Sequence, residues 1–469
     1  MNSSEEKITL PELKNEITAR QNIFEILKKD DRIVHLVLIG TKPDIIKQFP
    51  LITELKKQQK NVVIVHSGQH YDWNLSGSME EEFDINPDFN LNVRGTLHEQ
   101  QSQIITKLGF ILKKLKEMKK KIIPFTYGDT TTAAAAGIAS YLNDYAVAHV
   151  EAGLRTMTPD DSILHSLLND FDVQEYYEKL KERTVWHKGS YEPFPEQFCT
   201  RVSAPSTGVH LAPTSLNKIH LIKEGYDPTR IFAVGNLVAD AIQFVKKNSH
   251  KSTIFQKYSK LEEGNFIRFC VHRRENVMSK HRFCVLIKAM ASLIEKGENI
   301  LLISLGATEK ALIEFGLKNK ISLLAEKHNN FIYSPVWPSY NDVIAGMKKC
   351  STIATDSGSM QEETNILGIP GVVLRFNSDR PEAVFKGSNI LAPPIKSEIV
   401  EKIISTVQKN EDLRKKMKDQ KKLYGTNVSK KMINAVNEVL TDRPLFSLFE
   451  HQRLGLDKLD FWEKGDTNW

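Results

Sequence analysis

The chain has 469 residues, of which 41% are hydrophobic and 26% charged, and its formal net charge at pH 7 is +6. The length supports two ordinary domains with separate cores, and the composition is typical of a globular protein rather than a disordered or fibrous one. The positive excess is small for this length, so no nucleic-acid-binding surface is expected.

The sequence has no pattern of a membrane segment or of an export signal. Its first residues, Met-Asn-Ser-Ser-Glu-Glu-Lys, lack the basic-then-apolar order of a signal peptide, and no uninterrupted apolar run approaches the length of a membrane span. The cysteines have no metal-ligand spacing and fit a reducing compartment. We therefore expect a cytoplasmic protein that binds neither a metal nor a membrane. The cysteines are Cys199, Cys270, Cys284 and Cys350.

Short apolar runs alternate with segments of helical periodicity along nearly the whole chain. This alternation predicts parallel strands covered on both faces by helices, for example helices over 43–58, 98–119 and 131–142. About eleven strands are more than one such sheet usually holds, so two doubly wound domains with a hinge near 235–245 are predicted. The expected strands span 33–39, 61–66, 122–126, 146–150, 209–212, 231–234, 267–271, 300–304, 331–333, 351–355 and 371–375.

In this division, residues 33–238 form a first Rossmann-like domain and residues 239–410 a second, with their parallel sheets facing each other across a deep cleft. Residues 1–32 form a charged, helix-prone extension. Residues 411–469 form a C-terminal helix and an aromatic-containing tail, which are expected to pack back toward the first domain. Because parallel sheets bind ligands beyond the carboxyl ends of their strands, the loops at those ends are the candidate functional segments.

The most informative junction is the one where the apolar run 350–355 meets Asp356-Ser-Gly-Ser-Met-Gln-Glu-Glu363. Unpaired N–H groups and the positive end of a helix dipole suit a diphosphate, and Gly358 allows the backbone to approach closely. Ser357 and Ser359 add donors, and the two carboxylates one turn later are placed to accept hydrogen bonds from ribose hydroxyls. The pattern predicts a nucleotide-sugar site, although a capped helix after a tight turn has the same pattern.

Two clusters of basic residues favour the nucleotide-sugar interpretation. Lys42 and Lys47 lie in another strand–turn–helix junction, which follows the apolar run 34–39. Arg375 and Arg380 follow an apolar run soon after the Ser-Gly-Ser junction. Both clusters are therefore expected at strand ends, where an anionic ligand would bind.

Three carboxylates of the first half lie in similar positions. Asp129 and Glu151 each follow an apolar run, and Glu196 lies in a loop bracketed by prolines. Structural alternatives remain open for two of them, because Asp129 suits a helix N-cap and Glu151 could form an ion pair with Arg155.

In the second half, the apolar run 269–271 leads into His272-Arg273-Arg274-Glu275-Asn276. A histidine followed by two arginines is a poor core element and a good element for anion binding or proton transfer. No second histidine at metal-ligand spacing accompanies it, so no metal is expected here.

These motifs occur in one order, and together they resemble the non-hydrolysing UDP-N-acetylglucosamine 2-epimerases over roughly residues 33–435. The resemblance implies the two-domain GT-B architecture and a homodimer. It also implies that UDP is eliminated from UDP-N-acetylglucosamine (UDP-GlcNAc) to give a 2-acetamidoglucal and then adds back, with a proton on the other face of C2. The ligands are UDP-GlcNAc and UDP, and neither NAD nor a metal is needed. The motifs are Gly40–Lys47, Ser67–His70, Gly128–Thr130, Val150–Thr156, Pro195–Glu196, His272–Asn276, Asp356–Glu363 and Arg380–Val384.

The resemblance also assigns roles to residues. Asp129, Glu151 and Glu196 match the catalytic carboxylates, and their convergence in one cleft is expected to raise the pKa of at least one of them. His272 matches a histidine near the diphosphate that protonates or hydrogen-bonds the leaving group. Substrate or UDP binding falls to Lys42, Lys47, Arg155, Arg273, Ser357, Gly358, Ser359, Glu363 (on the ribose), Arg375 and Arg380. A loop that in bacterial relatives helps to hold a second, activating UDP-GlcNAc corresponds to Gln69 and His70.

Some positions depart from the family pattern. Lys42 replaces an arginine, which removes bidentate phosphate recognition. Ser359 replaces the second glycine of the phosphate turn, and Arg201 stands one position out of register in the altered loop 197–201. These changes alter the phosphate contacts that the family pattern implies.

The most conspicuous departure is an insertion at about 158–189, between the Glu151 and Glu196 motifs. Its apolar residues have helical spacing and precede the charged run 175–183, so it is expected to pack against the protein. The simpler interpretation is an added surface helix. The alternative is a lid or dimer element at the mouth of the cleft, because both ends adjoin proposed catalytic residues. The apolar residues are Ile163, Leu164, Leu167, Leu168 and Phe171.

Other functions remain open at the level of sequence. A GT-B glycosyltransferase shares the architecture but does not require the carboxylates and the histidine. A hydrolysing 2-epimerase would release UDP and N-acetylmannosamine, and a related UDP-2-acetamido sugar would undergo the same elimination. The changes at Lys42 and at 197–201 motivate a non-enzymatic UDP-sugar-binding regulator. For the epimerase, the expected role is supply of N-acetylmannosamine-type sugars for polysaccharide or glycan synthesis.

Overall fold

The computed structural model describes residues 17–69, 77–248, 252–420 and 422–442, with residues 451, 454–456 and 459 of the C-terminal tail. His70, predicted to help hold a second sugar nucleotide, lies outside these ranges, as do residues 1–16 of the predicted extension and most of the aromatic tail. Within the described part of the chain, no helix has both the length and the apolar character needed to cross a membrane.

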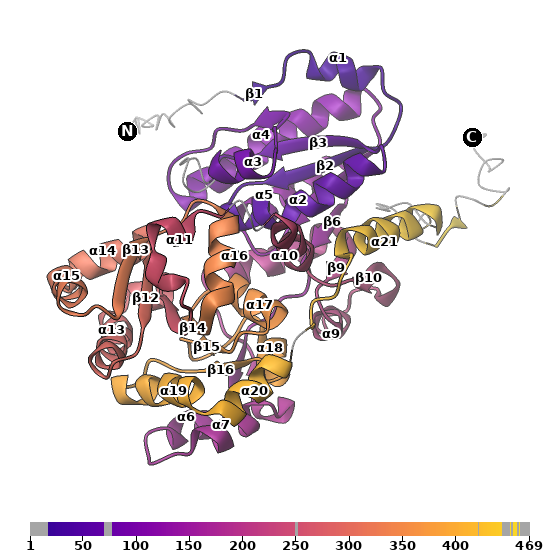
Figure 1. Cartoon of the computed structure of the whole chain (residues 1–469). Helices are drawn as coiled ribbons and strands as arrows, with labels where there is room; N and C mark the ends of the chain where they lie inside the picture. The colour runs from indigo at the N-terminus through magenta and orange to yellow at the C-terminus, as the bar shows by residue number, and fades with distance from the viewer. Residues whose placement is uncertain are drawn as a thin grey trace, which may run out of the picture.

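The first domain is built around an eight-stranded sheet (Figure 1). Its neighbouring strands pair in parallel except for the antiparallel pair at one edge. The central strands are buried along their whole length, as expected for a parallel sheet covered on both faces. In spatial order the strands are β1 (Thr18–Ala19), β4 (Phe89–Asn90), β3 (Asn61–His66), β2 (Val34–Ile39), β5 (Ile122–Tyr127), β6 (Val147–Val150), β9 (Thr207–Ala212) and β10 (Ile231–Ala233).

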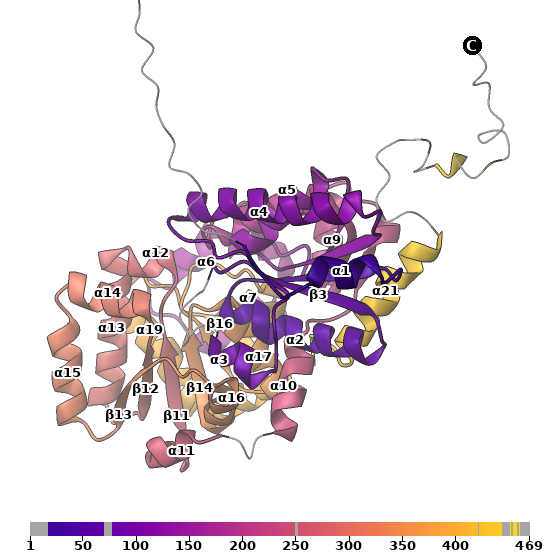
Figure 2. The ribbon, with the colours of Figure 1, turned by 90° about the horizontal axis from the view of Figure 1, so that it is seen from above.

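Successive residues of β2 pack on opposite faces of this sheet. Leu36 belongs to the apolar core shared with α4 (Leu97–Glu117) and α5 (Thr131–Tyr141). Val37 belongs to the core shared with α2 (Lys42–Lys57). Figure 2 shows α4 and α5 together on one side of the sheet and α2 on the other. The alternation of a strand's side chains thus explains why apolar runs without polar interruptions form these strands.

The second domain contains a six-stranded sheet in which every neighbouring pair is parallel. Helices cover it, among them α13 (Lys280–Glu295) and α19 (Ser397–Lys409), which pack against each other. The two sheets confirm the predicted α/β class with two doubly wound domains. In spatial order the strands are β13 (Phe331–Pro335), β12 (Ile300–Ser304), β11 (Phe266–Cys270), β14 (Cys350–Thr355), β15 (Gly371–Val373) and β16 (Asn389–Leu391).

Every strand predicted from the apolar runs is present, with its ends within two residues of the expected positions. The helices α2, α4 and α5 likewise match the predicted ranges within two residues. The unpredicted strands have only two or three residues, which is too short for an apolar pattern to emerge. They are β1, β4, β16, β7 (Met157–Pro159) and β8 (Trp186–Lys188).

The predicted insertion forms β7, α6 (Asp161–Ser166), α7 (Val173–Leu180) and β8, and the two strands pair antiparallel. Its apolar residues do pack, and their partner is the second domain: Ile163 lies in the same apolar core as α19. Figure 1 shows α6 and α7 beside α19. Leu168 is exposed, because α6 ends at Ser166 and the predicted spacing does not continue as one helix.

Besides the inserted segment, the described part of the chain passes between the domains at two places. It leaves the first domain after β10, where α10 (Val238–Lys247) contacts both α2 and α16 (Tyr340–Lys349). It returns near its end, where α21 (Val428–Asp442) packs against α2 and β9 (Figure 1). Both crossings lie on the side of the first sheet that carries α2.

Candidate active site

A cavity of about 360 Å³ opens between the domains, where the carboxyl ends of both parallel sheets meet. Parallel sheets bind ligands at these ends, so the cavity is the natural place for a substrate. Most of its lining side chains are polar or charged, and they come from both halves of the chain. They are Thr41, Pro43, Asp44, Lys47, Gln69, Leu97, Tyr127, Asp129, Thr130, Thr131, Glu151, Phe194, Pro195, Glu196, His272, Arg273, Arg274, Ser357, Ser359 and Arg380.

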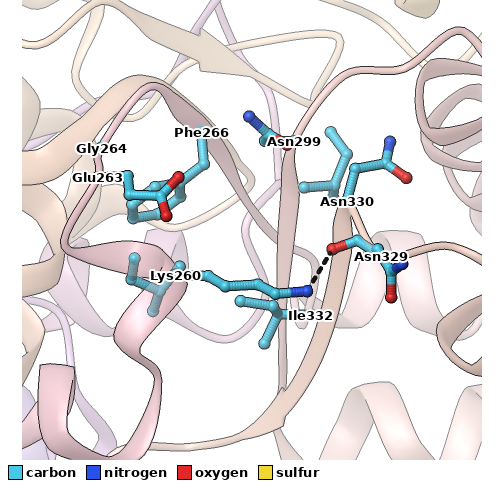
Figure 3. A pocket seen from close by; sticks show the side chains of 10 residues that line it. Lys260, Glu263, Gly264, Phe266, Asn299, Asn329, Asn330 and Ile332 are labelled. Atoms are coloured by element: carbon cyan, nitrogen blue, oxygen red, sulfur yellow. Dashed lines mark hydrogen bonds between the residues drawn. The ribbon is translucent and has the colours of Figure 1, made fainter.

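A second cavity, of about 320 Å³, lies within the second domain (Figure 3). It is lined by Phe266 and Ile300, which begin β11 and β12, so it opens at the amino ends of the strands. Lys260 Nζ there donates a hydrogen bond to the carbonyl oxygen of Asn329 at 3.1 Å. Because this cavity has few titratable groups and lies at the opposite end of the strands, the cavity between the domains is the candidate active site.

Asp129 and Glu151 come together because β5 and β6 are neighbours and each residue follows the end of its strand. The N-cap of α5 is Thr130, whose Oγ1 accepts a hydrogen bond from the N–H of Ala133 at 3.1 Å. Asp129 is therefore not used as a helix cap. Burial raises the pKa of Asp129 to about 6, against the opposing effect of Arg380.

Glu151 has a backbone φ of +63°, in the left-handed region that side chains other than glycine rarely adopt. Its Oε1 accepts hydrogen bonds from Lys47 Nζ at 2.9 Å and from Asn236 Nδ2 at 2.5 Å. Burial alone would raise the pKa of Glu151, but Lys47 and Arg380 outweigh burial and hold that pKa below its usual range. Glu151 is thus a fixed anion at the cavity.

Glu362 completes this cluster from the second domain. The sequence pattern placed Glu362 with Glu363 as an acceptor for ribose hydroxyls and did not predict this cluster. The buried carboxylate of Glu362 accepts hydrogen bonds from Lys47 Nζ at 2.5 Å and from Asn236 Nδ2 at 3.0 Å, and it pairs with Arg380 Nε. Burial raises the pKa of Glu362, and the nearby Glu151 adds to that rise. Two cations and two carboxylates from both domains are therefore held in one buried network.

The loop that begins at His272 is organised by Asp356, because β11 and β14 are neighbours in the second sheet. The Asp356 carboxylate accepts hydrogen bonds from the backbone N–H groups of His272 at 3.0 Å and of Arg273 at 2.9 Å. His272 Nδ1 lies 3.2 Å from Asp356 Oδ1. Burial lowers the pKa of His272, but Asp356 outweighs burial and raises it to about 10, so the ring is an imidazolium at neutral pH.

Glu196 begins α8 (Glu196–Ser203) and forms an ion pair with Arg273 from the other domain. Glu196 Oε2 and Asp129 Oδ2 are both buried, and within the described residues neither accepts a hydrogen bond. A buried carboxylate oxygen without a partner is costly, so these two atoms are suited to receive a proton or a polar ligand.

The helix α17 (Gly358–Leu367) points its N-terminus toward the cavity, where Ser357 and Ser359 form part of the lining. The first N–H groups of a helix have no partner within the helix and attract anions. A Cβ atom on Gly358 would lie 2.7 Å from Asp379 Oδ2. Glycine is therefore required for α17 and the loop of Asp379 to approach each other.

Two of the predicted binding residues are buried in ion pairs and do not line the cavity. Arg155 donates through Nε and Nη2 to the carboxylate of Glu224 at 2.8 and 2.6 Å, so it does not form the ion pair with Glu151 that was considered from sequence. Arg375 Nη1 donates to Asp379 Oδ1 at 2.8 Å. Their roles in substrate binding stay predictions.

Lys42 and Glu363 also lie outside the lining. Lys42 Nζ donates to the carbonyl oxygen of Pro338 at 3.0 Å, and burial lowers its pKa to about 8. Glu363 Oε1 accepts a hydrogen bond from Tyr340 Oη at 2.7 Å. Adjacent residues of a helix point in different directions, which is why Glu362 and not Glu363 joins Lys47.

Comparison with known proteins gives a consistent result over most of the chain. The family model described as UDP-N-acetylglucosamine 2-epimerase matches residues 53–164 and 188–437, so the match is interrupted within the predicted insertion. The UDP-N-acetylglucosamine 2-epimerase of Methanocaldococcus jannaschii is 31% identical over 374 residues, which cover 78% of this chain and 90% of that protein. The enzyme of that name from Bacillus subtilis is 28% identical over 418 residues, covering 86% and 94%.

Solved structures agree with this comparison. The M. jannaschii UDP-GlcNAc 2-epimerase in complex with UDP-GlcNAc and UDP superposes with a TM-score of 0.70 at 27% identity, covering 87% of this chain and 99% of that one. The Neisseria meningitidis enzyme bound to UDP-GlcNAc gives 0.69 at 24% identity, covering 87% and 100%, and bears on the fold alone. The expected GT-B architecture is thereby confirmed.

Proposed function

The chain belongs to the UDP-N-acetylglucosamine 2-epimerase family, and on that premise we propose that it interconverts UDP-GlcNAc and UDP-N-acetylmannosamine (UDP-ManNAc). The observation that carries the proposal is the cavity between the domains, where Asp129, Glu151 and Glu196 lie beside His272 and the N-terminus of α17. Such a site pairs acid–base groups with donors for a diphosphate, which is what the reaction requires.

The proposed chemistry is elimination followed by addition. The C2 hydrogen of the sugar is not acidic enough for simple removal and return, because no carbonyl adjoins it. A base takes the C2 proton, the electron pair forms the C1–C2 double bond, and the C1–oxygen bond breaks to release UDP. In the reverse sense, a UDP oxygen bonds to C1 of the 2-acetamidoglucal while a proton is delivered to the opposite face of C2.

We assign the proton transfers to Asp129 and Glu196. Each has a buried carboxylate oxygen without a hydrogen-bond partner among the described residues. Glu151, by contrast, already accepts hydrogen bonds from Lys47 and Asn236. Its proposed role is to keep those side chains in place and to balance the positive charge of the site. Epimerisation needs a proton to leave one face of C2 and another to arrive at the opposite face. Two carboxylates on different elements supply one proton-exchanging group for each face.

The departing diphosphate is assigned to the second domain. The imidazolium of His272 and the first-turn N–H groups of α17 present positive charge to the same cavity, and Ser357 and Ser359 add hydroxyl donors. Glu363 is proposed to accept hydrogen bonds from the ribose hydroxyls. Arg155 and Arg375, which lie in buried ion pairs, are proposed to hold the loops that carry the site.

A product balance tests this function and separates it from hydrolysis. The enzyme is incubated with UDP-GlcNAc, and the sugar nucleotides are separated by chromatography. We expect a stable mixture of UDP-GlcNAc and UDP-ManNAc, with free UDP remaining far below the UDP-ManNAc formed. Accumulation of UDP with N-acetylmannosamine would show a hydrolysing enzyme, and an unchanged substrate would contradict the proposal.

Two variants complete that experiment. Asp129→Asn removes the proposed proton acceptor and is expected to lower the rate at least about a hundredfold. Asp31→Asn makes the same chemical change at an exposed position and is expected to have no effect.

We further propose a homodimer that supplies N-acetylmannosamine-type sugars for glycan synthesis, and light scattering of the purified protein checks the dimer.

A further inference from the structure

The segment 157–188, here called the strap, leaves the first domain and packs against the second. Its buried apolar side chains belong to the same core as β11, α13 and α19 of the second domain. Figure 1 shows its helices α6 and α7 beside α19. Most of the strap, residues 165–187, is not matched by the family model, so a function of the strap would go beyond what that model describes.

Polar contacts fix the strap on the second domain. Tyr177 Oη donates a hydrogen bond to the carbonyl oxygen of Gly387 at 2.8 Å. The ring of Trp186 meets that of Phe385 edge-on, with centroids 5.2 Å apart. A surface flap that packed weakly would not bury an aromatic side chain and satisfy its hydroxyl group in this way.

At the first end of the strap, two adjacent residues are bound to different domains. Thr156 is tied to the first domain, because its N–H donates to Gln197 Oε1 at 3.0 Å. The next residue, Met157, exchanges two backbone hydrogen bonds with Ser378 of the second domain, each 3.0 Å long. Adjacent residues are thus bound to different domains, and the domains cannot separate here without breaking one of the two attachments.

The other end leads directly to a proposed catalytic residue. After β8, Glu192 accepts hydrogen bonds from Arg282 at 2.8 Å and from Asn377 at 3.0 Å, both in the second domain. Four residues later, Glu196 pairs with Arg273. The loop that carries Glu196 is therefore attached to the second domain before it enters α8, which packs against α5 of the first.

We propose that the strap holds the two domains closed in the absence of nucleotide and that the loop that follows it positions Glu196 against Arg273, with Glu192 as the main positioning residue. The catalytic part of this inference rests on the proposed epimerase function, whereas the closed arrangement does not. The simpler possibility is that the strap only covers the second domain and moves with it. That possibility conflicts with the adjacent attachments of Thr156 and Met157.

The test keeps the base of the strap and removes the packed segment that, in this proposal, anchors Met157 to the second domain. Pro159 and Trp186 are paired across β7 and β8, so residues 160–185 can be replaced by Asn-Gly, which forms a tight hairpin turn. Small-angle X-ray scattering gives the radius of gyration with and without UDP. We expect the same radius for the native chain in both conditions. The shortened chain is expected to be larger without UDP and to contract when UDP is added.

A second variant leaves the apolar surface covered, in case the shortened chain does not fold. Glu192→Ala releases the loop of Glu196 from Arg282 and Asn377, and we expect kcat to fall about tenfold while the Kd for UDP changes less than about threefold. Glu192→Gln keeps one of the two acceptor oxygens, so it is expected to recover part of kcat. Glu182→Ala changes an exposed glutamate of the strap and is the matched control.

The outcomes separate the two claims. If the native chain contracts with UDP as much as the shortened chain, or if the shortened chain keeps the native radius, the strap does not hold the domains closed. If Glu192→Ala keeps the native kcat, the loop that follows the strap does not position Glu196. If no form of the protein acts on UDP-GlcNAc, the proposed function fails, and the radii measured without nucleotide for the native and the shortened chain still decide the question of closure.

Discussion

Asp129 and Glu151 follow neighbouring strands, yet their surroundings shift the pKa values of the two carboxyl groups in opposite directions. Glu151 accepts hydrogen bonds from Lys47 and Asn236, and cations hold its pKa low. Asp129 Oδ2 is buried and has no hydrogen bond from the described residues, and burial raises the pKa of that group to about 6. This contrast is what one expects of a charge-holding group beside a proton-exchanging group.

The raised pKa of Asp129 predicts the acid side of the activity profile. If the ionised carboxylate of Asp129 accepts the C2 proton, kcat/KM falls about tenfold per pH unit below about pH 6. His272, with a pKa of about 10, does not titrate in this range. Initial rates with UDP-GlcNAc between pH 4.5 and 8 check this, and a rate that stays constant down to pH 5 would rule out Asp129 as the base.

His272 predicts a stability change at the alkaline side. Its folded-state pKa of about 10 lies above the unfolded value of 6.5, so its contribution is complete below pH 6.5 and is lost as pH rises through 10. His272→Gln should therefore lower the free energy of unfolding by about 2 to 4 kcal/mol at pH 6 and by much less at pH 10. Urea unfolding at both pH values measures this. An equal loss at both would mean that the imidazolium–Asp356 pair does not stabilise the fold.

Several site residues could be predicted because they follow apolar runs. Asp129 and His272 each follow a strand after one intervening residue, and parallel strands bring such residues to one edge of a sheet. Asn236 was not predicted, and Glu362 was predicted only as an acceptor for ribose hydroxyls, because their part in the buried cluster comes from contacts across the domain boundary. Sequence spacing within one domain carries no information about those contacts.

At the scale of elements, α17 brings a helix N-terminus and Ser357 to the cavity. The helix can take this position because Gly358 leaves room for Asp379. Asp379 is in turn held by Arg375, which is how a predicted binding residue contributes without lining the cavity. The strand–glycine–helix pattern predicted this junction, and the structure explains the need for glycine by a contact with a side chain from another loop.

The contact at Gly358 gives a prediction about nucleotide binding. Gly358→Ala would place a Cβ atom 2.7 Å from Asp379 Oδ2, so the helix or the loop must shift, and we expect the Kd for UDP to rise at least about tenfold. Gly306 begins α14 (Gly306–Glu314) in the same domain, and a Cβ atom there would meet no described atom within 4 Å. Titration calorimetry should show native affinity for Gly306→Ala. Native affinity for Gly358→Ala would argue against diphosphate binding at α17.

At the scale of the whole molecule, the two domains are joined by ion pairs as well as by the backbone segments that connect them. Lys47 of the first domain donates to Glu151 and to Glu362 of the second, and Arg380 approaches the same two carboxylates. Removing one partner from such a buried network leaves an uncompensated charge, which costs more than the network contributes as a whole.

This network predicts non-additive effects on stability. Lys47→Met should lower the free energy of unfolding by about 3 kcal/mol or more, because two buried carboxylates lose their shared cation. Adding Glu362→Gln to Lys47→Met should restore about 1 kcal/mol or more, since an amide at that position does not need the cation that Lys47 supplied. Denaturant unfolding of both single variants and the double variant measures the coupling. Additive losses would mean that the two side chains act independently.

The packing of the insertion was predictable only in part. Its apolar spacing indicated a packed element, and Ile163 and Leu167 are buried as that spacing requires. The partner could not be predicted, because an amphipathic helix shows which face is covered and not what covers it. The surface that covers it belongs to the second domain, which is remote in sequence.

The central claim is that the C2–H bond of the sugar breaks within the cavity between the domains. Proton NMR of the enzyme with UDP-GlcNAc in deuterium oxide tests it most directly. The proposed elimination predicts that the C2 proton signal of UDP-GlcNAc disappears as deuterated UDP-ManNAc forms, and that Asp129→Asn abolishes both changes. Formation of UDP-ManNAc with its C2 proton retained would contradict elimination and return of UDP.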